Sequence, residues 1–424
     1  MKKKIKEFIF KYHDKGLFEG CFSLIVLLAI GSYAYINKGK VEGIIDLTIF
    51  FSVFVALILN LFTGFISRIV GNKFEDSIKL ETDYDKMVKR YSEEKNMVTY
   101  INSECNDEAY KIGIKSRLDK DLSERHKFKF PVIQDFSCKN TTFRIIDNKE
   151  RQYHLPQEIK EHYDELINIH KTSSIFNQLT IRVKNWERIE NTVFIYTERS
   201  TYYDAMVSNR AMDLKWSNGL SNRDLFAYGP WLGGLENSPF SNHLGFNGFI
   251  ESSDGEIPFV RRNSIVSIGK RTLANSVGAS LKTKYALDDQ FNLTIDGLVN
   301  GIKKEIQDEL KIDPNDYIFS LEDNIISLYR DIVEGGKPQL LFYVKIDITK
   351  EQINNTFKKE ISRKKSTWNM QEEDGNNLVW VKRDELKELF ISPDTIVIQK
   401  KKYSIMPTAS ASIVMLINYL KQEI

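Results

Sequence analysis

The sequence predicts an α+β protein whose N-terminal part is a transmembrane helical hairpin and whose remainder is cytoplasmic. The distribution of apolar and charged residues along the chain supports this fold class. Residues 1–71 contain two long apolar runs, whereas the rest of the chain mixes charged helical segments with short segments rich in β-branched and aromatic residues. Sixty Lys and Arg offset 58 Asp and Glu among the 424 residues, which excludes a strongly basic nucleic-acid coat and an acidic disordered tail.

The two apolar runs cover residues 20–36 and about 44–70. Each is long enough to cross a hydrocarbon core of about 30 Å as a helix. Lysines are concentrated before the first run, and the short connecting loop carries only Lys38 and Lys40. Because positive residues flank membrane helices on the cytoplasmic side, we expect both termini and the soluble domain to be cytoplasmic, at an inner or plasma membrane. The lipid bilayer is then a partner.

Changes in composition predict four regions along the chain. They are a two-helix anchor, a helical stalk, a mixed α/β middle region and a C-terminal domain, at residues 1–71, 72–107, 108–240 and 241–424. The stalk is highly charged, with apolar residues at roughly helical spacing. It is either a coiled coil that forms a homo-oligomer or a solvated connector helix.

The middle region combines helical and strand patterns. Hydrophobic spacing predicts a helix at 157–171, and alternating β-branched and aromatic residues predict strands at 176–186 and 192–200. The segment 226–240 is rich in glycine and aromatic residues. Such a segment suits a binding loop or a packed irregular connector equally well.

Several kinds of catalytic and metal site have no counterpart in the sequence. The three cysteines form no CxxC pair and no cluster with histidine at zinc-ligand spacing, so no disulfide framework is expected. The HExxH, GxSxG, Cys-His and Walker-type patterns are absent as well. The acidic residues of one C-terminal helix are therefore the main candidates for chemistry.

The C-terminal domain begins with strand patterns. Segments 244–250 and 256–261 read as two strands, and Asp254 with Gly255 predicts that a turn joins them as a hairpin. A further strand is expected at 274–281.

A helix is expected at 295–312, where an apolar residue recurs every four positions and creates one buried face. These residues are Leu298, Ile302, Ile306 and Leu310. Glu305, Asp308 and Glu309 lie beside that face and meet on one surface of the helix. Their mutual repulsion needs a compensating cation, and Mg²⁺ prefers carboxylate oxygens. The three acids are candidate metal ligands, and the alternative is a solvated acidic face balanced by lysines of the same helix.

The sequence around these acids resembles the second half of the Nudix box, the signature of the Nudix hydrolase superfamily. Residues 304–312 read KEIQDELKI. Glu305 matches the Glu that follows Arg in the signature. Asp308 and Glu309 occupy the position of its Glu pair, and Lys311 replaces its second glycine. The resemblance covers the C-terminal domain, and it implies an α/β/α sandwich with a mixed sheet.

The same resemblance implies the chemistry of the site. Nudix enzymes use Mg²⁺ to assist the attack of water on a nucleoside diphosphate linked to another group. By this resemblance Glu305 and Glu309 would be the principal metal ligands and catalytic residues, and Asp308 would assist as a third ligand.

Three further residues are candidates for ligand binding. Gly278 lies where the family has a glycine-containing turn. Arg261 and Arg262 follow a predicted strand, so one should face each side of the sheet. Arginine binds phosphate through two parallel hydrogen bonds, so either residue could contact a phosphate group.

Two functions from different classes remain open. In the first, the protein senses a nucleotide-derived small molecule in the cytoplasm and acts through its transmembrane helices, a layout that resembles bacterial antiphage membrane effectors. The alternative is a membrane-tethered, Mg²⁺-dependent Nudix hydrolase of nucleoside diphosphate derivatives. Enzymatic activity is therefore undecided. We expect a homo-oligomer and no nucleic-acid polymer as a partner.

Overall fold

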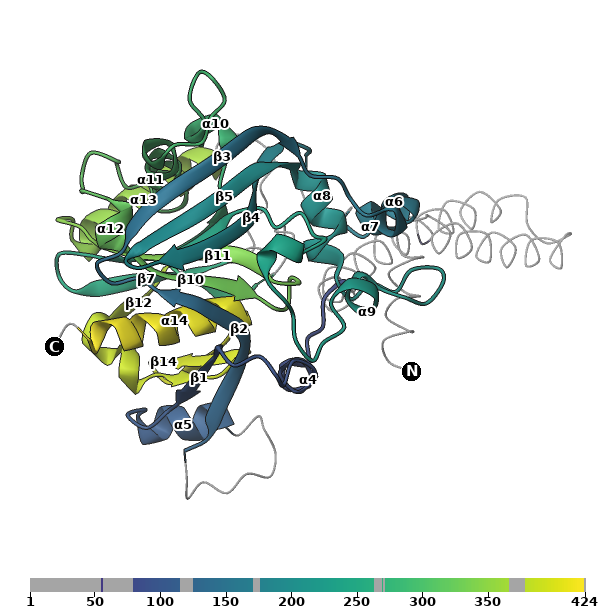
Figure 1. Cartoon of the computed structure of the whole chain (residues 1–424). Coiled ribbons are helices and arrows are strands. Elements are labelled where there is room, and N and C mark those ends of the chain that lie inside the picture. The colour runs from purple at the N-terminus through teal and green to yellow at the C-terminus, as the bar shows by residue number, and fades with distance from the viewer. Residues whose placement is uncertain are drawn as a thin grey trace, which may run out of the picture. The chain divides into compact units, whose positions relative to one another are not determined.

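The computed structural model describes residues 55, 79–114, 125–170, 176–262, 269, 271–365 and 378–422. The chain divides into two compact units, Met1–Ile78 and Lys79–Ile424. The second unit holds nearly all the described residues and is an α+β body with mixed sheets (Figure 1).

The transmembrane part of the predicted fold class is wrong for the described residues, because none of their helices is both long and apolar enough to cross a membrane. The most apolar long helix, α14 (Pro407–Leu420), has 14 residues and is roughly 21 Å long, against a hydrocarbon core of about 30 Å. The two apolar runs at 20–36 and 44–70 lie outside the described residues, apart from Val55.

A six-stranded mixed sheet forms the centre of the second unit. Its strands, in spatial order, are β1 (Met97–Ile101), β2 (Lys127–Ser137), β10 (Ile325–Asp331), β11 (Lys337–Lys345), β6 (Gly245–Glu251) and β9 (Val277–Ser280). Only β11 and β6 pair in parallel, and the other neighbours are antiparallel. Every residue of β6 is buried, because strands flank both its edges and packed layers cover both its faces.

The described residues also form three smaller sheets. They are β3 (Thr142–Gln152), β5 (Thr192–Thr201) and β4 (Leu179–Ile189); β12 (Leu378–Lys382), β7 (Glu256–Arg261) and β8 (Leu273–Ala274); and β13 (Phe390–Ile391), β14 (Thr395–Ile398) and β15 (Lys401–Ser404). The sheet of β3, β5 and β4 covers one face of the central sheet together with α11 (Ile295–Leu310). Helix α14 covers the opposite face (Figure 1).

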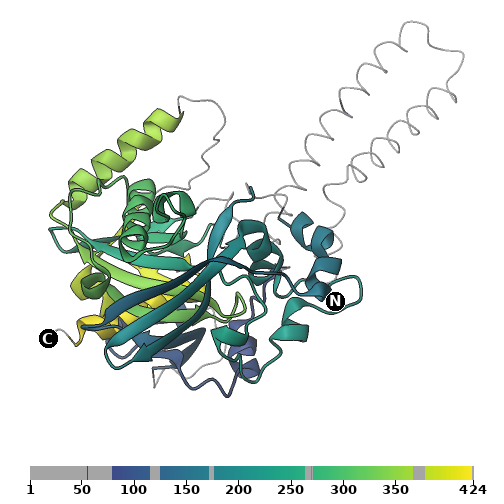
Figure 2. The ribbon, with the colours of Figure 1, turned by 45° about the horizontal axis from the view of Figure 1, so that its top comes forward.

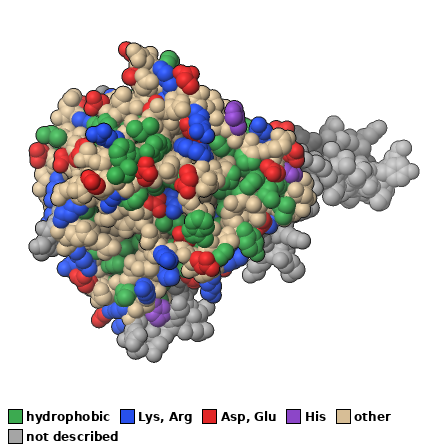
Figure 3. Space-filling model, in the orientation of Figure 1, with side chains coloured by type: hydrophobic (Ala, Val, Ile, Leu, Met, Phe, Trp, Pro, Cys, Tyr) green, Lys and Arg blue, Asp and Glu red, His purple; other side chains and the backbone are tan. Residues whose placement is uncertain are grey.

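The remaining helices are short, with one exception. They are α4 (Tyr84–Arg90), α5 (Asp107–Ile114), α6 (Gln157–Glu161), α7 (Tyr163–Asn168), α8 (Tyr202–Val207), η1 (Asn209–Ala211), α9 (Asn222–Phe226), η2 (Leu235–Asn237), α10 (Thr283–Ala286), α12 (Leu321–Asn324), α13 (Lys350–Lys365) and η3 (Arg383–Glu388). The long helix α13 runs beside α11 (Figures 1 and 2). Acidic and basic side chains lie interspersed over the face shown in Figure 3, as the near-balanced composition suggests.

The central sheet contains strands from three of the predicted regions. Strand β1 belongs to the predicted stalk, β2 to the middle region, and the other four to the C-terminal domain. The stalk segment is therefore not one helix, because α4 is followed by a strand of this sheet. The boundaries at 107/108 and 240/241 thus fall between strands that hydrogen-bond within one sheet.

Most of the predicted elements are observed with small shifts, and two differ. The predicted helix at 157–171 is broken at His162 into α6 and α7. The predicted hairpin has its turn, with Gly255 at φ 76° and the Ser252 amide donating to the Glu256 carbonyl at 2.9 Å. Its strands do not pair, because β11 and β9 already occupy both edges of β6, and β7 pairs with β12 and β8 instead.

Helix α11 forms where its apolar spacing predicts. The Thr294 side chain caps its first turn by accepting from the Gly297 amide, and the four predicted apolar residues are fully buried. The helix ends at Lys311, which has left-handed backbone geometry with φ 63°. Lys311 stands at the second glycine position of the Nudix signature, so the backbone there adopts the conformation that favours glycine even though the residue is lysine.

Lys311→Gly should therefore stabilise the protein. We expect the free energy of unfolding to rise by about 0.5–1 kcal/mol, since a left-handed non-glycine residue costs about 1–2 kcal/mol and the greater freedom of glycine in the unfolded chain returns part of that. Urea denaturation measures the change. Gln307→Gly, in the right-handed part of the same helix, is the matched control and should destabilise by about 1 kcal/mol. A loss of stability in Lys311→Gly would contradict the expectation.

Candidate functional site

The three predicted acidic residues lie on one side of α11 and differ in their surroundings. Glu305 is buried, with 2% of its side chain exposed, whereas Asp308 and Glu309 are exposed to solvent. A buried carboxylate on a helix needs a partner of opposite charge. That partner comes from outside the helix.

The partner is Lys282, which lies between β9 and α10. Its Nζ is 3.0 Å from Glu305 Oε1 and 2.9 Å from Asp308 Oδ2, so a single ammonium group bridges two of the three acids. Lys282 is not among the residues predicted from the sequence, because it lies outside the Nudix signature and no local pattern distinguishes it from other lysines.

Two glycines of α11 allow this contact. A Cβ atom on Gly297 would lie 2.0 Å from the Ala286 carbonyl oxygen, and one on Gly301 would lie 2.6 Å from Leu281 Cδ1. The segment 281–286 can therefore lie directly on the helix. Gly301 is one turn before Glu305, so the same close approach brings Lys282 to the acids.

The pKa values of the acids reflect burial and the bridging lysine. Burial raises the pKa of Glu305 to about 7, although Lys282 partly offsets the effect. Burial also disfavours the charged form of Asp308, but the hydrogen bond from Lys282 outweighs it and lowers the pKa of that group. Glu309 is reached by solvent, yet the protein packed around its carboxyl raises its pKa against the opposing charges of Arg262 and Lys282.

A second group of charges is buried where β10 turns into β11. Lys337 Nζ lies 3.5 Å and Arg210 Nε 3.4 Å from Glu334 Oε2, and all three side chains are largely or fully buried. Asp331 pairs directly with Lys337 across the strands, and burial raises the pKa of its carboxyl. Burial disfavours the Glu334 carboxylate as well, but Lys337, Arg210 and Arg262 outweigh it and lower its pKa.

His243 borders the same group. Burial, with the charges of Lys337 and Arg210, lowers its pKa well below the usual value, so its ring is neutral. Its Nε2 lies 3.0 Å from Ser280 Oγ on β9, and the Tyr202 ring stacks on it with the ring centroids 6.1 Å apart. The group therefore extends from the β10–β11 turn to the edge strand of the central sheet.

Arg262 follows β7, and its amide donates to the Thr272 carbonyl at 2.9 Å. The positive charge of Arg262 partly opposes the rise in the pKa of Glu309 and contributes to the lowered pKa of Glu334. The predicted residues Glu305, Asp308 and Glu309 lie together on α11. Arg261 ends β7, where it pairs with Leu273.

Gly278 lies in strand β9, opposite Asn247, and not in the turn that the sequence predicted. A Cβ atom on it would lie 3.1 Å from Asn247 Oδ1, so the glycine allows that side chain to approach the strand.

The arrangement of the helix acids does not fit the predicted Mg²⁺. Among the residues that the structure describes, no three His, Cys, Asp or Glu side chains are placed to hold a metal ion. The ammonium of Lys282 contacts the oxygens of Glu305 and Asp308 that a metal would need.

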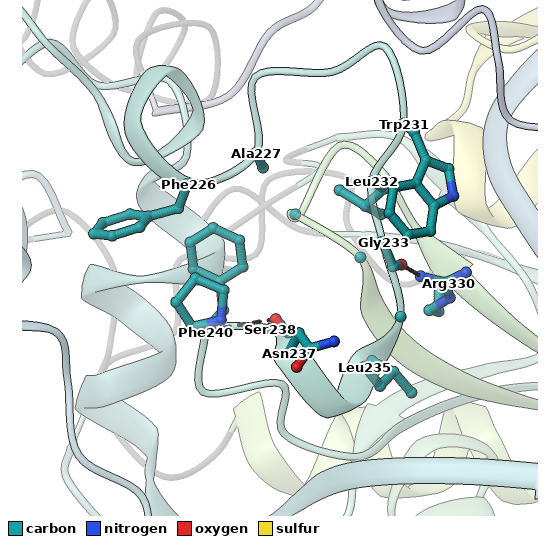
Figure 4. A pocket seen from close by; sticks show the side chains of 14 residues that line it. Phe226, Ala227, Trp231, Leu232, Gly233, Leu235, Asn237, Ser238, Phe240 and Arg330 are labelled. Carbon is teal, nitrogen blue, oxygen red and sulfur yellow. Dashed lines mark hydrogen bonds between the residues drawn. The ribbon is translucent and has the colours of Figure 1, made fainter.

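A cavity of about 230 Å³ lies elsewhere, against the predicted aromatic and glycine-rich segment (Figure 4). Phe226 and Phe240 line one side, and Trp231 and Leu232 line the other. The one charged residue that lines it is Arg330, which donates to Asp135 at 2.7 and 3.0 Å and to the Gly233 carbonyl. The charge of Arg330 is thus already paired with a carboxylate.

Comparison with known proteins adds no assignment. No family model matches the chain, and no curated protein is similar to it in sequence. The function must therefore be inferred from the residues themselves and from the Nudix resemblance.

The close approach of segment 281–286 predicts a difference between two glycine substitutions. Gly297→Ala should lower the free energy of unfolding by about 1–3 kcal/mol, because its new methyl group meets a backbone carbonyl. Gly301→Ala on the same helix is the matched control. Its methyl group meets the end of a leucine side chain that can move, and alanine favours the helix by about 1 kcal/mol, so the net loss should be smaller. Equal losses in urea denaturation would contradict this packing.

Glu305→Gln should change the pH dependence of stability. Between pH 4.5 and about 7 the unfolded chain releases the Glu305 proton while the folded protein retains it, so the wild type loses stability as pH rises through this window. The glutamine variant lacks this loss. Its stability relative to wild type should increase by about 3 kcal/mol across the window and stay constant above it. Urea denaturation at several pH values measures this, with the exposed Glu158→Gln as control; a difference that does not depend on pH would refute it.

Proposed function

We propose that this protein is a Nudix-like module that binds a phosphate-bearing, nucleotide-derived small molecule at the surface between α11 and the β10–β11 turn. The observation that carries the proposal is the set of basic side chains held against two buried carboxylates: Lys282 Nζ lies 3.0 Å from Glu305 Oε1, and Lys337 Nζ and Arg210 Nε lie 3.5 and 3.4 Å from Glu334 Oε2. Basic side chains from four separate parts of the chain gather around these two points. They are Lys282, Arg262, Lys337 and Arg210.

Phosphate chemistry suits this arrangement. An arginine can bind two phosphate oxygens at once, and hydrogen bonds between charged groups are the strong ones. Lys337 is buried, and burial lowers its pKa, so an anionic ligand nearby would stabilise its charged form. A bound anion would thus offset part of the free-energy cost of burying the charge of Lys337.

The nucleotide class of the ligand is supported by the Nudix resemblance alone. That resemblance also implies the alternative of Mg²⁺-dependent hydrolysis. Binding without turnover is the better-supported function, because Lys282 occupies the carboxylate oxygens that the hydrolytic metal would need.

Arg262→Ala should weaken ligand binding by about 10–100-fold, the cost of losing one or two hydrogen bonds to a charged group. Isothermal titration calorimetry on the purified full chain would measure this, with nucleoside diphosphate derivatives and cyclic oligonucleotides as ligands. Arg261→Ala is the matched control and should leave the affinity within about twofold, because Arg261 is the last residue of β7 and the residue that follows it in extended backbone points to the opposite side.

Three outcomes would count against the proposal. They are the absence of binding by any of these nucleotides, equal effects of the two arginine substitutions, and Mg²⁺-dependent turnover that Glu305→Gln and Glu309→Gln abolish. The last outcome would establish the hydrolase instead.

A further inference from the structure

The position of Lys282 affects ligand binding as well as the stability of the fold. Its ammonium lies 3.0 Å from Glu305 and 2.9 Å from Asp308, two of the three acids that resemble the metal ligands of a Nudix box. A divalent cation at such a site would sit between the same carboxylates. We infer that Lys282 supplies, from within the chain, the positive charge that a metal ion supplies in such a box, so that this site takes its anionic ligand without a metal.

The contact is built into the fold, because the backbone around Lys282 is held on both sides. The Leu281 amide donates to the Leu244 carbonyl at 3.0 Å, and the Tyr285 amide donates to the Lys282 carbonyl at 3.1 Å. Thr283 Oγ1 donates to the Leu179 carbonyl at 3.1 Å. These bonds and the two helix glycines fix the lysine more firmly than an ordinary surface lysine.

Two lysines of the same helix have other partners. Lys303 donates to the Tyr317 carbonyl, and Lys304 donates to the Gln307 side chain. Lys311, at the end of the helix, contributes charge to Asp308 and Glu309, but it donates to the Asp308 carbonyl and not to a carboxylate. The contact with the carboxylates of Glu305 and Asp308 comes from Lys282, which is separated from Asp308 by 26 residues in the sequence.

The lysine also remains available to a ligand. About a third of its side chain is exposed, at 34%, although the Glu305 carboxylate beneath it is buried. An ammonium group carries three N–H donors, and one of them donates to Asp308 Oδ2. A remaining donor can point to an oxygen of a bound phosphate.

A divalent ion would have to displace the ammonium to reach these oxygens, because two cations cannot share them without strong repulsion. Removal of the lysine should therefore create a metal site where the wild type has none. Buried and partly buried carboxylates that lose their neighbouring cation are destabilising, so a new cation that binds them lowers the free energy of the folded protein.

The test uses the metal alone, so its result does not depend on the identity of the ligand. The full chain is stripped with a chelator, and its thermal unfolding midpoint is measured with and without Mg²⁺ or Mn²⁺, for the wild type, Lys282→Ala, Lys282→Met and the control Lys303→Ala. The wild type and Lys303→Ala should not respond to metal. Both Lys282 variants should unfold at a lower temperature without metal and should recover by about 2 °C or more with it. A second substitution, Glu305→Gln, should abolish that recovery.

The inference is overturned if the wild type itself is stabilised by the metal and Glu305→Gln removes the effect, or if neither Lys282 variant gains a response. The wild-type measurement alone can refute it, so poor folding of the variants does not protect it. The ligand part rests on the proposed function and has its own readout. Nucleotide affinity of the wild type should be the same in chelator and in Mg²⁺, whereas a complete lack of nucleotide binding would refute the proposed function and leave the metal result to stand.

Discussion

The packing of segment 281–286 against α11 determines which charged groups meet at the acidic site, and it does so more than any single acidic residue. Gly297 and Gly301 have no side chains, so a neighbouring backbone can lie against the helix where side chains would otherwise separate them. This closeness delivers Lys282 to Glu305, which could not otherwise carry a charge in its buried position. The acids of α11 and their counter-charge thus depend on two positions whose only contribution is the absence of a side chain.

Two kinds of buried charge coexist in the second unit, and their geometry separates them. Arg223 and Asp213 form two hydrogen bonds of 2.7 and 2.9 Å, and the arginine also donates to the Ile332 and Val333 carbonyls. Such a saturated pair fixes the fold. The Glu334 carboxylate has its cations at 3.4–3.5 Å, which is too long for strong hydrogen bonds. Charged side chains that are buried at an energetic cost, with their counter-charges at such distances, are typical of functional sites.

The sequence predicted local features well and tertiary ones poorly. The period of apolar residues was sufficient for α11, because one helix face must meet the core whatever lies opposite, and the grouping of Glu305, Asp308 and Glu309 results from helix geometry alone. Lys282 could not be predicted, because its contact depends on how segment 281–286 packs on the helix. The failure of β6 and β7 to pair with each other has the same cause. A good turn was present between them, but competition from β11 and β9 for the edges of β6 decided the pairing.

The left-handed residue that ends α11 has a consequence for how this chain relates to others. Glycine is the residue that adopts left-handed backbone geometry at least cost, but it is not the only one that can adopt it. Lys311 has φ 63° without being glycine. A pattern expressed in amino-acid letters therefore cannot detect this helix end, whereas one expressed in backbone angles can. Searches for distant relatives of this protein should therefore compare conformations at the ends of the acidic helix before they compare residues.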